Sequence, residues 1–414
     1  MKRVQIAVVG AGASGLMAAG KAARCLRERG KAGQVILLEG NPRPGKKLLA
    51  TGNGRCNLTN LHISPERYHG DAEAAKAVLA RWPSRQVMEE FGSLGLICTS
   101  DSEGRAYPNS LQAAAVLQVL WSACEEAGVE TAWGFEVRSI ALRQNGFLLT
   151  SKSGETLFAE KCILACGGMA SPKHSCEEKG YGLVKALGHT VTELSPALVP
   201  LKTSSRLCRS LKGNRCKAKA ALYRGEEKLG EEQGEVLFGD GQLSGICIFD
   251  LSSRLGKKWE HTELRLDLLS RFSVQGITNY LKQLRKNRPA LPAGELFSGA
   301  LNLRIGQELV KCLGFSREMP ISKLSPQQLK QAAEAAKALR FPITGPGSWE
   351  SAQVTVGGVP LRELELSRME SKKCPGLYLT GELLNVNGDC GGFNLHWAWA
   401  TGLTAGQSAA ASIK

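Results

Sequence analysis

The chain has 414 residues, of which 43% are hydrophobic and 22% charged, and its formal net charge is +15. This composition excludes disordered and fibrous proteins, and the length predicts two or three domains. No apolar run reaches the roughly 20 residues that a membrane-spanning helix needs. Thirteen scattered cysteines without a C-x-x-C pair predict reduced thiols, and neither a metal site nor a dithiol redox centre.

The N-terminal segment predicts a strand–helix–strand unit, with strands at residues 4–10 and 35–39 and a helix at 14–29. Cleavage of a secretory leader would destroy the first turn, so we expect a cytoplasmic protein without a membrane partner. The turn reads G-x-G-x-x-G and the second strand ends in an acid, a pattern typical of dinucleotide binding. The predicted contact residues are Gly10, Gly12, Ala13, Ser14, Gly15, Glu39 and Gly40.

Each glycine of this turn has its own task. Gly10 permits the tight turn, Gly12 lets backbone N–H groups reach a pyrophosphate, and Gly15 lets helix and strand pack closely. Glu39 is expected to accept hydrogen bonds from ribose hydroxyls and to disfavour a 2′-phosphate. The alternative is a glycine-rich turn that binds nothing.

Residues 42–60 predict an ordered loop that faces a ligand, because they are rich in Gly, Asn, Lys and Arg. Its side chains suit a flavin ring or the carbonyl groups of a substrate. For Cys56 a packed thiol is the favoured alternative, since no second cysteine follows at disulfide-reductase spacing. The catalytic residue stays unassigned, with Arg55, Asn57 and Cys56 as candidates. The predicted cofactor contacts of the loop are Lys47, Gly54, Arg55, Cys56 and Asn57.

The middle of the chain predicts helices at 72–94, broken at Trp82-Pro83, and at 111–127. A small β-meander follows at 135–158 and a buried strand at 162–166. Short strands are expected at 200–267, helices at 270–340, further β structure at 341–365, a strand at 377–381 and a helix at 394–413. Ser325-Pro326 is expected to cap and start the last of the helices at 270–340. The simplest account is an insertion, in which residues near 196–345 interrupt a nucleotide-binding domain made from both ends of the chain.

Two later segments favour FAD over NAD. The strand that ends in Cys166-Gly167-Gly168 resembles the point in two-domain flavoproteins where the chain returns to the pyrophosphate. The strand ending at Gly381-Glu382 resembles their C-terminal strand, whose acid holds the ribityl chain. A glycine pair then opens the last helix, so free N–H groups and a positive helix end would face the flavin N1–C2=O edge. The predicted contacts are Val137, Ala165, Gly167, Gly381, Glu382, Gly391, Gly392, Phe393 and Asn394.

The positive charge is uneven. Residues 195–345 hold 25 Lys/Arg and 14 Asp/Glu, a net charge of +11. One run in this segment has seven cations and no acid, and it predicts a polyanion-binding surface or else a solvated basic face. The candidate RNA-binding residues are Lys202, Arg206, Arg209, Lys212, Arg215, Lys217 and Lys219.

Together these segments resemble the BaiN/RdsA-type, or aminoacetone-oxidase-like, flavoproteins. The resemblance rests on residues 45–60 (GKKLLATGNGRCNLTN), 234–251 (GEVLFGDGQLSGICIFDL), 357–359, 369–372 and 381–397. It implies an α/β Rossmann-like FAD-binding domain in two parts (1–195 and 345–414), with an inserted β-barrel-like domain (196–268) and a helical subdomain (269–344). The family's usual acidic run appears here as Asn385-Val386-Asn387-Gly388, and its Thr-Gly-rich segment is replaced at 174–180, so the local electrostatics and any proton donor stay open.

The activities that the resemblance implies differ in substrate. They are the reduction of uridine to dihydrouridine in ribosomal RNA, reductive steps on steroid-like bile-acid intermediates, and the oxidation of an aminoketone. The first two share hydride delivery from flavin N5 to a polarised C=C bond. The basic insert favours ribosomal RNA as the partner. A small-molecule reductase or oxidase and a non-catalytic flavin-bearing RNA-binding factor are the alternatives, and NAD(P)H is expected as a transient electron donor.

Overall fold

The structure is a computed structural model that describes residues 1–31, 34–171, 179–255 and 259–414. It divides into two compact units, residues 1–196 with 352–414 and residues 197–351. Among the described residues, no helix combines the length and apolarity that crossing a bilayer requires. The insertion of the second unit between two stretches of the first agrees with the predicted fold class.

The first unit is built on a nine-stranded sheet in the order β19-β20-β21-β10-β1-β2-β7, to which β8 and β9 are joined at β10. Its strands are β1 (Lys2–Val9), β2 (Val35–Glu39), β7 (Glu130–Trp133), β8 (Val137–Arg143), β9 (Gly146–Ser151), β10 (Thr156–Leu164), β19 (Leu364–Glu365), β20 (Glu370–Ser371) and β21 (Leu377–Leu379). The β7, β2, β1, β10 and β21 strands run parallel, and their carboxyl ends meet at one edge.

Helices and smaller strands complete the first unit. The helices are α1 (Ala13–Glu28), α2 (Lys46–Ala50), α3 (Ala72–Arg81), α4 (Ser84–Ser93), α5 (Ala113–Glu126), α6 (Lys179–Ala186) and α12 (Phe393–Ala411), with short 3-10 turns at 51–54, 65–67, 361–363 and 381–383. The smaller strands are β3 (Thr59–Asn60), β5 (Cys98–Ser100), β6 (Arg105–Pro108), β4 (Tyr68–Gly70), β22 (Val386–Gly388), β11 (Ser195–Ala197) and β18 (Val354–Val356).

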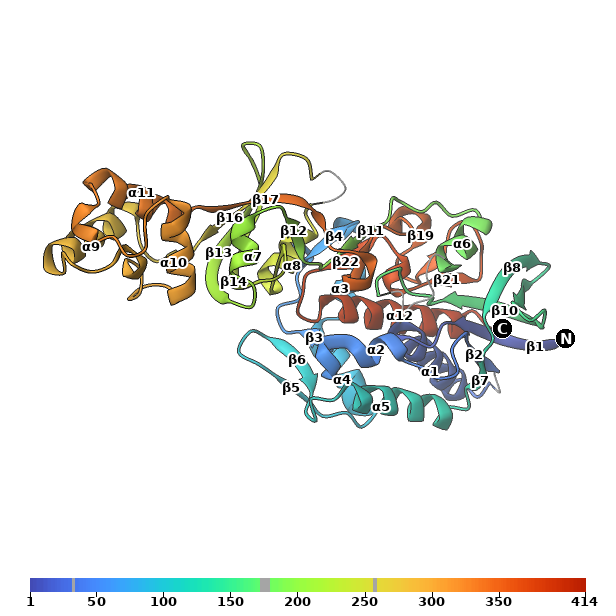
Figure 1. Cartoon of the computed structure of the whole chain (residues 1–414). Coiled ribbons are helices and arrows are strands. Elements are labelled where there is room, and N and C mark those ends of the chain that lie inside the picture. The colour runs from blue at the N-terminus through green and yellow to red at the C-terminus, as the bar shows by residue number, and fades with distance from the viewer. Residues whose placement is uncertain (32–33, 172–178, 256–258) are drawn as a thin grey trace. The chain divides into compact units, whose positions relative to one another are not determined.

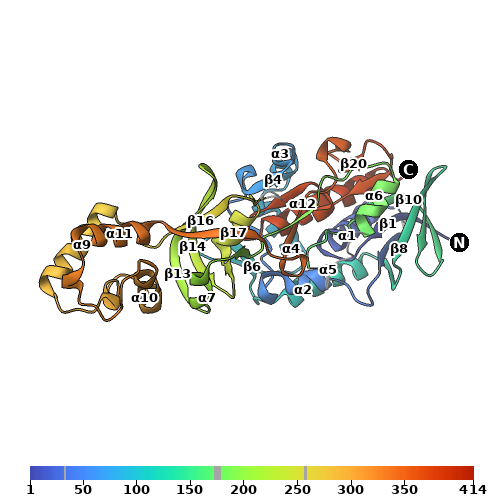
Figure 2. The ribbon, with the colours of Figure 1, turned by 45° about the horizontal axis from the view of Figure 1, so that its top comes forward.

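Helices α1 and α12 lie side by side (Figures 1 and 2), although they come from opposite ends of the chain. Small residues allow this contact. A Cβ on Gly402 would lie 2.6 Å from the Ser14 carbonyl oxygen, and one on Gly406 would lie 2.4 Å from that of Ala18. The C-terminal helix is therefore packed directly against the helix that opens the cofactor turn.

The second unit contains a closed six-stranded barrel in the order β12-β15-β14-β13-β16-β17. Its elements are β12 (Leu201–Thr203), α7 (Arg206–Ser210), β13 (Arg215–Arg224), β14 (Glu227–Phe238), β15 (Gln242–Ser244), α8 (Ile246–Ser252), β16 (Thr262–Asp267) and β17 (Leu339–Pro346). The helical segment consists of α9 (Val274–Asn287), α10 (Leu303–Cys312) and α11 (Pro326–Lys337), with 3-10 turns at 293–295 and 321–323; a further 3-10 turn at 349–351 follows β17.

Two predicted boundaries differ from the structure. The helical range of 269–344 runs into β17, whose alternating burial makes it the sixth barrel strand and which leads from α11 back to the barrel (Figure 2). The predicted end of the meander and the next strand are one continuous strand, β10. The break between α3 and α4 at Trp82-Pro83 is confirmed, as is the start of α11, where Ser325 and Gln328 form a capping box.

Candidate functional site

The three glycines of the first turn meet three different steric demands. A Cβ on Gly10, which has a φ of 103°, would lie 2.5 Å from the Ala165 carbonyl oxygen, and one on Gly15 would lie 1.8 Å from that of Gly10. At Gly12 nothing lies within 4 Å of the same position. No side chain caps the N-terminus of α1. The backbone is therefore tightly packed at Gly10 and Gly15 but open at Gly12, where the first N–H groups of α1 have no side-chain cap.

The acid at the end of β2 is held beside this turn. Glu39 is buried, and its carboxylate accepts hydrogen bonds from the Ala11 N–H at 2.8 Å and from the backbone and side chain of Asn41 at 2.8 and 2.7 Å. A Cβ on Gly40 would lie 3.4 Å from Glu136, which precedes buried Val137 at the start of β8. The structure therefore brings Glu39, Gly40 and Val137 to one end of the turn.

A second charged group forms where β10 and β21 end. The Lys47 ammonium lies 2.6 Å from one Glu382 oxygen, and the Thr355 N–H donates to the other at 2.8 Å. Gly168 has to be small, because its Cβ would lie 2.6 Å from the same carboxylate. Ala165, Gly167 and Gly381 adjoin this pair on the connections that follow the two strands. Two residues that are 335 positions apart are thus joined in one ion pair.

The glycine pair before α12 adopts backbone conformations that other residues avoid. The φ angles of Gly391 and Gly392 are 115° and 102°, and a Cβ on Gly392 would lie 2.4 Å from the Thr59 carbonyl oxygen. In the amide orientation that satisfies both of its polar atoms, Asn57 accepts from the Gly392 N–H at 3.3 Å and donates to Thr59 at 3.1 Å. No side chain caps α12 itself. The N–H groups of its first turn are therefore left for a ligand.

Comparison with known proteins identifies this arrangement. The model of the family described as HI0933-like protein Rossmann domain matches residues 4–408. The chain belongs to this family. It is accordingly an FAD-dependent oxidoreductase, and its membership counts against a non-catalytic role.

Two curated relatives of this HI0933-like chain extend over almost its whole length. A 3-dehydro-bile acid delta(4,6)-reductase of Clostridium scindens is 37% identical over 98% of this chain and 99% of the relative. A ribosomal RNA dihydrouridine synthase of Escherichia coli is 27% identical over 98% of both chains. Among solved structures, 3-ketosteroid-delta4-(5alpha)-dehydrogenase from Rhodococcus jostii RHA1 has a TM-score of 0.51 at 15% identity, covering 99% of this chain and 97% of that one, which supports the fold.

The residues of this HI0933-like protein fit FAD. A pyrophosphate would bind in the open space at Gly12, and buried Glu39 lies at the strand end where an adenosine ribose would bind. Phe393 is buried against the edge of Tyr68, with ring centroids 5.9 Å apart, and Asn394 binds both the N–H and the carbonyl of Gly388. These two side chains therefore shape the Gly391-Gly392 turn rather than point away from it.

The structure separates the three candidate catalytic residues of this oxidoreductase. Asn57 braces the glycine pair, as described above. Cys56 is fully buried, and burial raises the pKa of its thiol to about 12, which favours the packed-thiol alternative. Arg55 is exposed, with its guanidinium 5.7 Å from the centre of the Tyr107 ring, and neighbouring Gly54 has open space around it. Of the three, Arg55 has the exposed side chain that a substrate could reach, although its Nε also donates to the Gly52 carbonyl at 3.4 Å.

Sequence reasoning missed the surroundings of Arg55. Arg55 lines a cavity of about 250 Å³. The other lining residues lie on β5, β6 and the turns beside them, and they form no recognisable sequence motif: Thr99, Ser100, Asp101, Arg105, Tyr107 and Leu111. A larger cavity of about 610 Å³, between residues 70–74 and the segment around Leu361, contains none of the predicted site residues. Among the described residues of this HI0933-like chain, no group of His, Cys, Asp or Glu could hold a metal ion.

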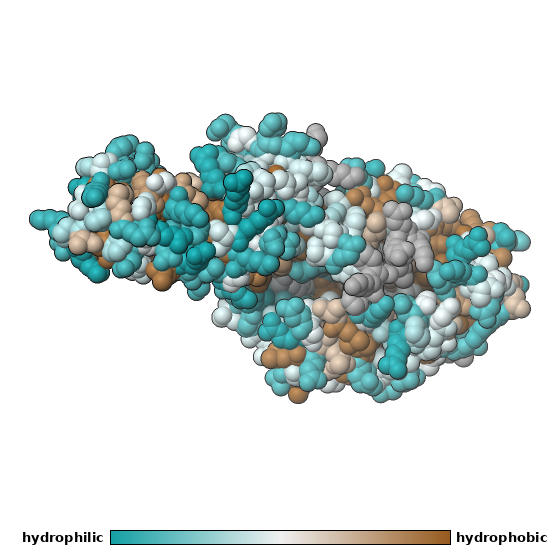
Figure 3. Space-filling model, in the orientation of Figure 1, coloured by the Kyte–Doolittle hydropathy of each residue, from teal (hydrophilic) through white to brown (hydrophobic). Residues whose placement is uncertain are grey.

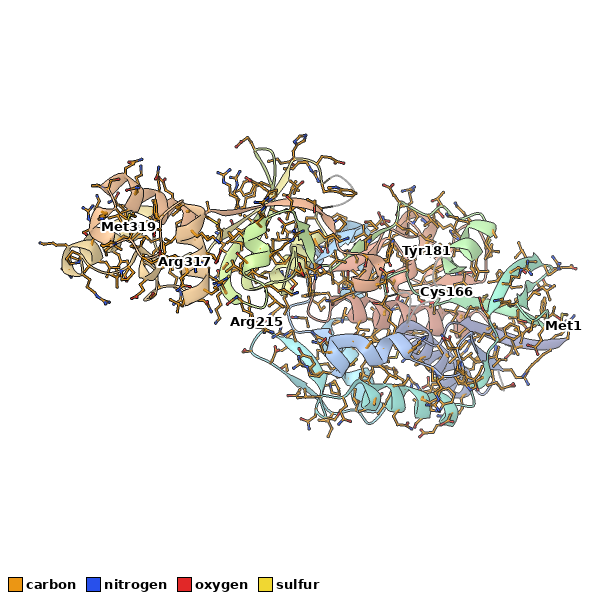
Figure 4. All side chains as sticks on the ribbon, in the orientation of Figure 1. Met1, Cys166, Tyr181, Arg215, Arg317 and Met319 are labelled. Atoms are coloured by element: carbon orange, nitrogen blue, oxygen red, sulfur yellow. The ribbon has the colours of Figure 1, made fainter. Side chains whose placement is uncertain are left out.

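The predicted basic run of the insert is not a surface of one sign. β14 pairs antiparallel with β13 and brings acids beside its cations. Arg215 lies 3.0 Å from Glu235, Lys219 pairs with Glu231, and Asp240 lies 3.0 Å from Lys212 and 4.0 Å from Arg209. Among the described ion pairs, none involves Lys202, Arg206 or Lys217. Figure 3 shows that this face of the barrel is hydrophilic, which agrees with charges of both signs. Arg215 is labelled there in Figure 4.

The segment at 174–180, where the sequence departs from the family pattern, lies largely outside the described residues. Its last residue, Gly180, lies in α6 and packs closely against Cys166, which follows β10. A Cβ on Gly180 would lie 2.6 Å from Cβ of Cys166, so only glycine fits there. Tyr181, which follows, donates a hydrogen bond to the Glu382 carbonyl at 3.2 Å, and Figure 4 shows both Cys166 and Tyr181 in this region.

Proposed function

We propose that this enzyme reduces a C=C bond conjugated to a carbonyl group, in a small ring enone or dienone of the steroid type. The observation that carries the proposal is the 37% identity, over nearly the full length of both chains, to a reductase that acts on a 3-dehydro-bile acid. The glycine turn at residues 10–15 supports the proposal, since it would bind FAD, and reduced FAD would supply the hydride. A nicotinamide nucleotide is the proposed electron donor.

Several residues would hold FAD in this role. The N–H groups at Gly12 would bind the pyrophosphate, Glu39 would bind a ribose, and the Lys47–Glu382 pair would meet the ribityl chain. The uncapped start of α12 supplies N–H donors and the positive end of a helix dipole, which stabilise negative charge. Exposed Arg55 beside the 250 Å³ cavity would bind the carbonyl end of the substrate and stabilise the negative charge that develops on its oxygen.

We prefer the small-molecule substrate because the seven cations between Lys202 and Lys219 no longer favour RNA. Four of these seven cations have carboxylate partners within the same unit, so the charge that a phosphate backbone would meet is reduced. Exposed ion pairs of this kind contribute little stability, but they lower the local positive potential.

Uridine in ribosomal RNA is the second candidate substrate, and a different surface favours it. Residues 269–338, which lie between β16 and β17, hold 11 Lys/Arg and 4 Asp/Glu, a net charge of +7, so most of the insert's positive charge lies in the helical segment rather than in the barrel. Phe272 and Tyr280 are 59% and 45% exposed there. Exposed aromatic rings among cations suit stacking on unpaired bases.

The two substrates are separated by one comparison. Purified protein, kept anaerobic with NADH or NADPH, is given a steroid 4,6-dien-3-one or ribosomal RNA from a strain in which the gene is deleted. We expect loss of the dienone absorbance and an unchanged dihydrouridine content by nucleoside mass spectrometry. Dihydrouridine formation without dienone reduction would transfer the assignment to RNA, and activity on neither substrate would overturn the proposal.

A further inference from the structure

A histidine and a buried carboxylate lie beside the glycine pair that precedes α12. Asp389 is only 1% exposed, and one of its oxygens lies 2.8 Å from Nε2 of His69. The other lies 3.2 Å from the Arg67 guanidinium. His69 comes from β4 and is the partner of Asn387 on β22, so that residues 69, 387 and 389 share one side of this two-stranded sheet. Residues far apart in the sequence thus form a His–Asp pair next to the predicted flavin edge.

The pair is held firmly against the start of α12. The Asp389 N–H donates to the Arg67 carbonyl at 3.0 Å, and the Asn394 amide binds Gly388 on both of its polar groups. The Arg67 guanidinium lies 5.4 Å from the centre of the Phe393 ring. A turn bound in this way fixes the orientation of the carboxylate, and the carboxylate in turn fixes the imidazole.

Other titratable groups near this turn do not suit proton transfer at neutral pH. Tyr68 donates to the Phe393 carbonyl, and burial raises its pKa well above the usual value. Burial raises the pKa of the Cys56 thiol to about 12 and lowers the pKa of fully buried His396 to about 4. The His69 side chain is 25% exposed, and Nδ1 makes no hydrogen bond to any described residue. His69 therefore combines partial exposure with a carboxylate partner that orients its ring.

We propose that His69 is the proton donor of the reduction and that Asp389 is its positioning residue; this rests on the proposed function. Bound, reduced FAD would supply the hydride for the β-carbon, and the C=C electron pair would move to the carbonyl oxygen as an enolate. The Nδ1–H bond of the His69 imidazolium breaks and a C–H bond forms at the α-carbon, which restores the ketone. Neutral His69 then takes a proton from water. The same step would serve C5 of uridine.

Two charged groups lie beside His69. The Asp389 carboxylate lies 2.8 Å from its Nε2, and the Arg67 guanidinium lies 3.2 Å from the same carboxylate. Asp71 lies two residues further along and accepts a hydrogen bond from the Leu361 N–H at 2.7 Å. Since the imidazolium is the active form, kcat should fall as pH rises through the pKa of the enzyme–substrate complex.

The test uses holoprotein carrying His69→Gln or Asp389→Asn, with His62→Gln as the matched control, because His62 is an exposed histidine of the same segment. We expect His69→Gln to lower kcat by about 10²–10⁴-fold and to abolish its fall at high pH. Flavin content and the rate of flavin reduction by the nicotinamide nucleotide should stay unchanged. The control should match the wild type throughout.

A second readout needs no turnover. In ¹⁵N NMR spectra of the oxidised holoprotein, Asp389→Asn should shift the imidazole nitrogen signals of His69, because the ring loses the carboxylate that lies 2.8 Å from its Nε2. Unchanged His69 signals in Asp389→Asn, or a His69→Gln enzyme with wild-type kcat and pH profile, would overturn the role of this pair alone. Failure of the wild type on both substrate classes would instead overturn the proposed function, and this role with it.

Discussion

Replacement of Gly12 by valine would fill the open space above the cofactor turn. Gly12 has extended backbone angles (φ −86°, ψ −166°) that valine tolerates, and nothing lies within 4 Å of its Cβ position. We therefore expect Gly12→Val to fold normally but to be purified without flavin, because the methyl groups would occupy the place of the pyrophosphate.

Absorbance spectra and the released cofactor measure this effect. Gly92→Val is the control, since Gly92 is exposed on α4 and also has nothing within 4 Å. FAD rather than FMN should be released from the control and the wild type. Full flavin occupancy in Gly12→Val would contradict the assignment of the turn.

Residues in contiguous motifs were the most predictable part of the site. The structure places the glycine turn, Glu39 and the Gly391-Gly392 pair at strand ends or helix starts, because each motif encodes its own local geometry. The Lys47–Glu382 and His69–Asp389 pairs carry no such signal, since their partners lie 335 and 320 residues apart. Their roles toward FAD and substrate stay predictions.

At the scale of elements, α12 should control the charge of the reduced cofactor. Its uncapped N–H groups and positive dipole end favour negative charge at the flavin N1–C2=O edge. We expect them to lower the pKa of N1 by about one unit, so that the reduced flavin is anionic at pH 7. Anaerobic spectra of the reduced protein between pH 6 and 8 measure this, and a neutral reduced flavin at pH 7 would count against it.

A buried network joins the segment after α6 to the 3-10 turn at 361–363 and to β20. His189 lies 2.7 Å from Glu363 through Nδ1 and 2.8 Å from the Ser371 hydroxyl through Nε2. Burial acts to raise the pKa of Glu363, but hydrogen bonds from Thr190, Lys373 and His189 hold it at about 2. Because this pKa is depressed, the Glu363 carboxylate stabilises the folded protein. Its contribution is complete above the pKa of about 4.3 that a glutamate has in the unfolded chain, and it is lost as the pH falls toward 2.

Glu363→Gln should therefore unfold more easily at pH 7, by about 2 kcal/mol, since it leaves buried partners without a carboxylate. Its stability should fall less than that of the wild type between pH 4.5 and pH 3. Urea denaturation at these pH values measures both effects, with Glu365→Gln as a control on an exposed neighbour. Equal acid sensitivity of wild type and Glu363→Gln would show that another group dominates acid unfolding.

Element types were predicted better than element partners. Periodicity and turn residues gave α1, β2, α5 and α11 in nearly the right places. Local pattern cannot show that β17 closes the barrel after the helical segment, or that β14 sets acids against the cations of β13. Strand pairing depends on contacts that are distant in sequence. The sequence therefore could not show that acids lie beside the cations of residues 202–219, so that the surface there carries charges of both signs.

At the scale of the whole molecule, any binding of ribosomal RNA should depend on the helical segment more than on the barrel. Joint replacement of Lys282, Lys286 and Arg288 by glutamine should reduce the slope of log K against log salt by roughly 0.7–0.9 for each lost phosphate contact. The matched barrel variant, Arg209, Arg215 and Lys217 to glutamine, should change the slope less, because Arg209 and Arg215 have acidic partners.

Fluorescence anisotropy at several salt concentrations measures these slopes, and flavin content should be unaffected in both variants. A larger loss in the barrel variant would restore the original interpretation of the run. Wild-type protein that shows no salt-dependent binding at all would leave the small-molecule substrate as the sole candidate.

The position of β10 in the sheet, between β1 and β21, has a consequence for biosynthesis. β21 and α12 are translated only after the whole of residues 197–351, and at about 5–20 residues per second the 218 residues after Pro196 take on the order of 10–40 s. During that interval Thr156–Ala159 of β10 can already pair with β9, but Cys162–Leu164 have no partner on the same edge and the Gly391-Gly392 turn does not yet exist. The flavin site of a nascent chain therefore cannot be completed until the whole second unit has been synthesised and residues 391–392 have emerged from the ribosome.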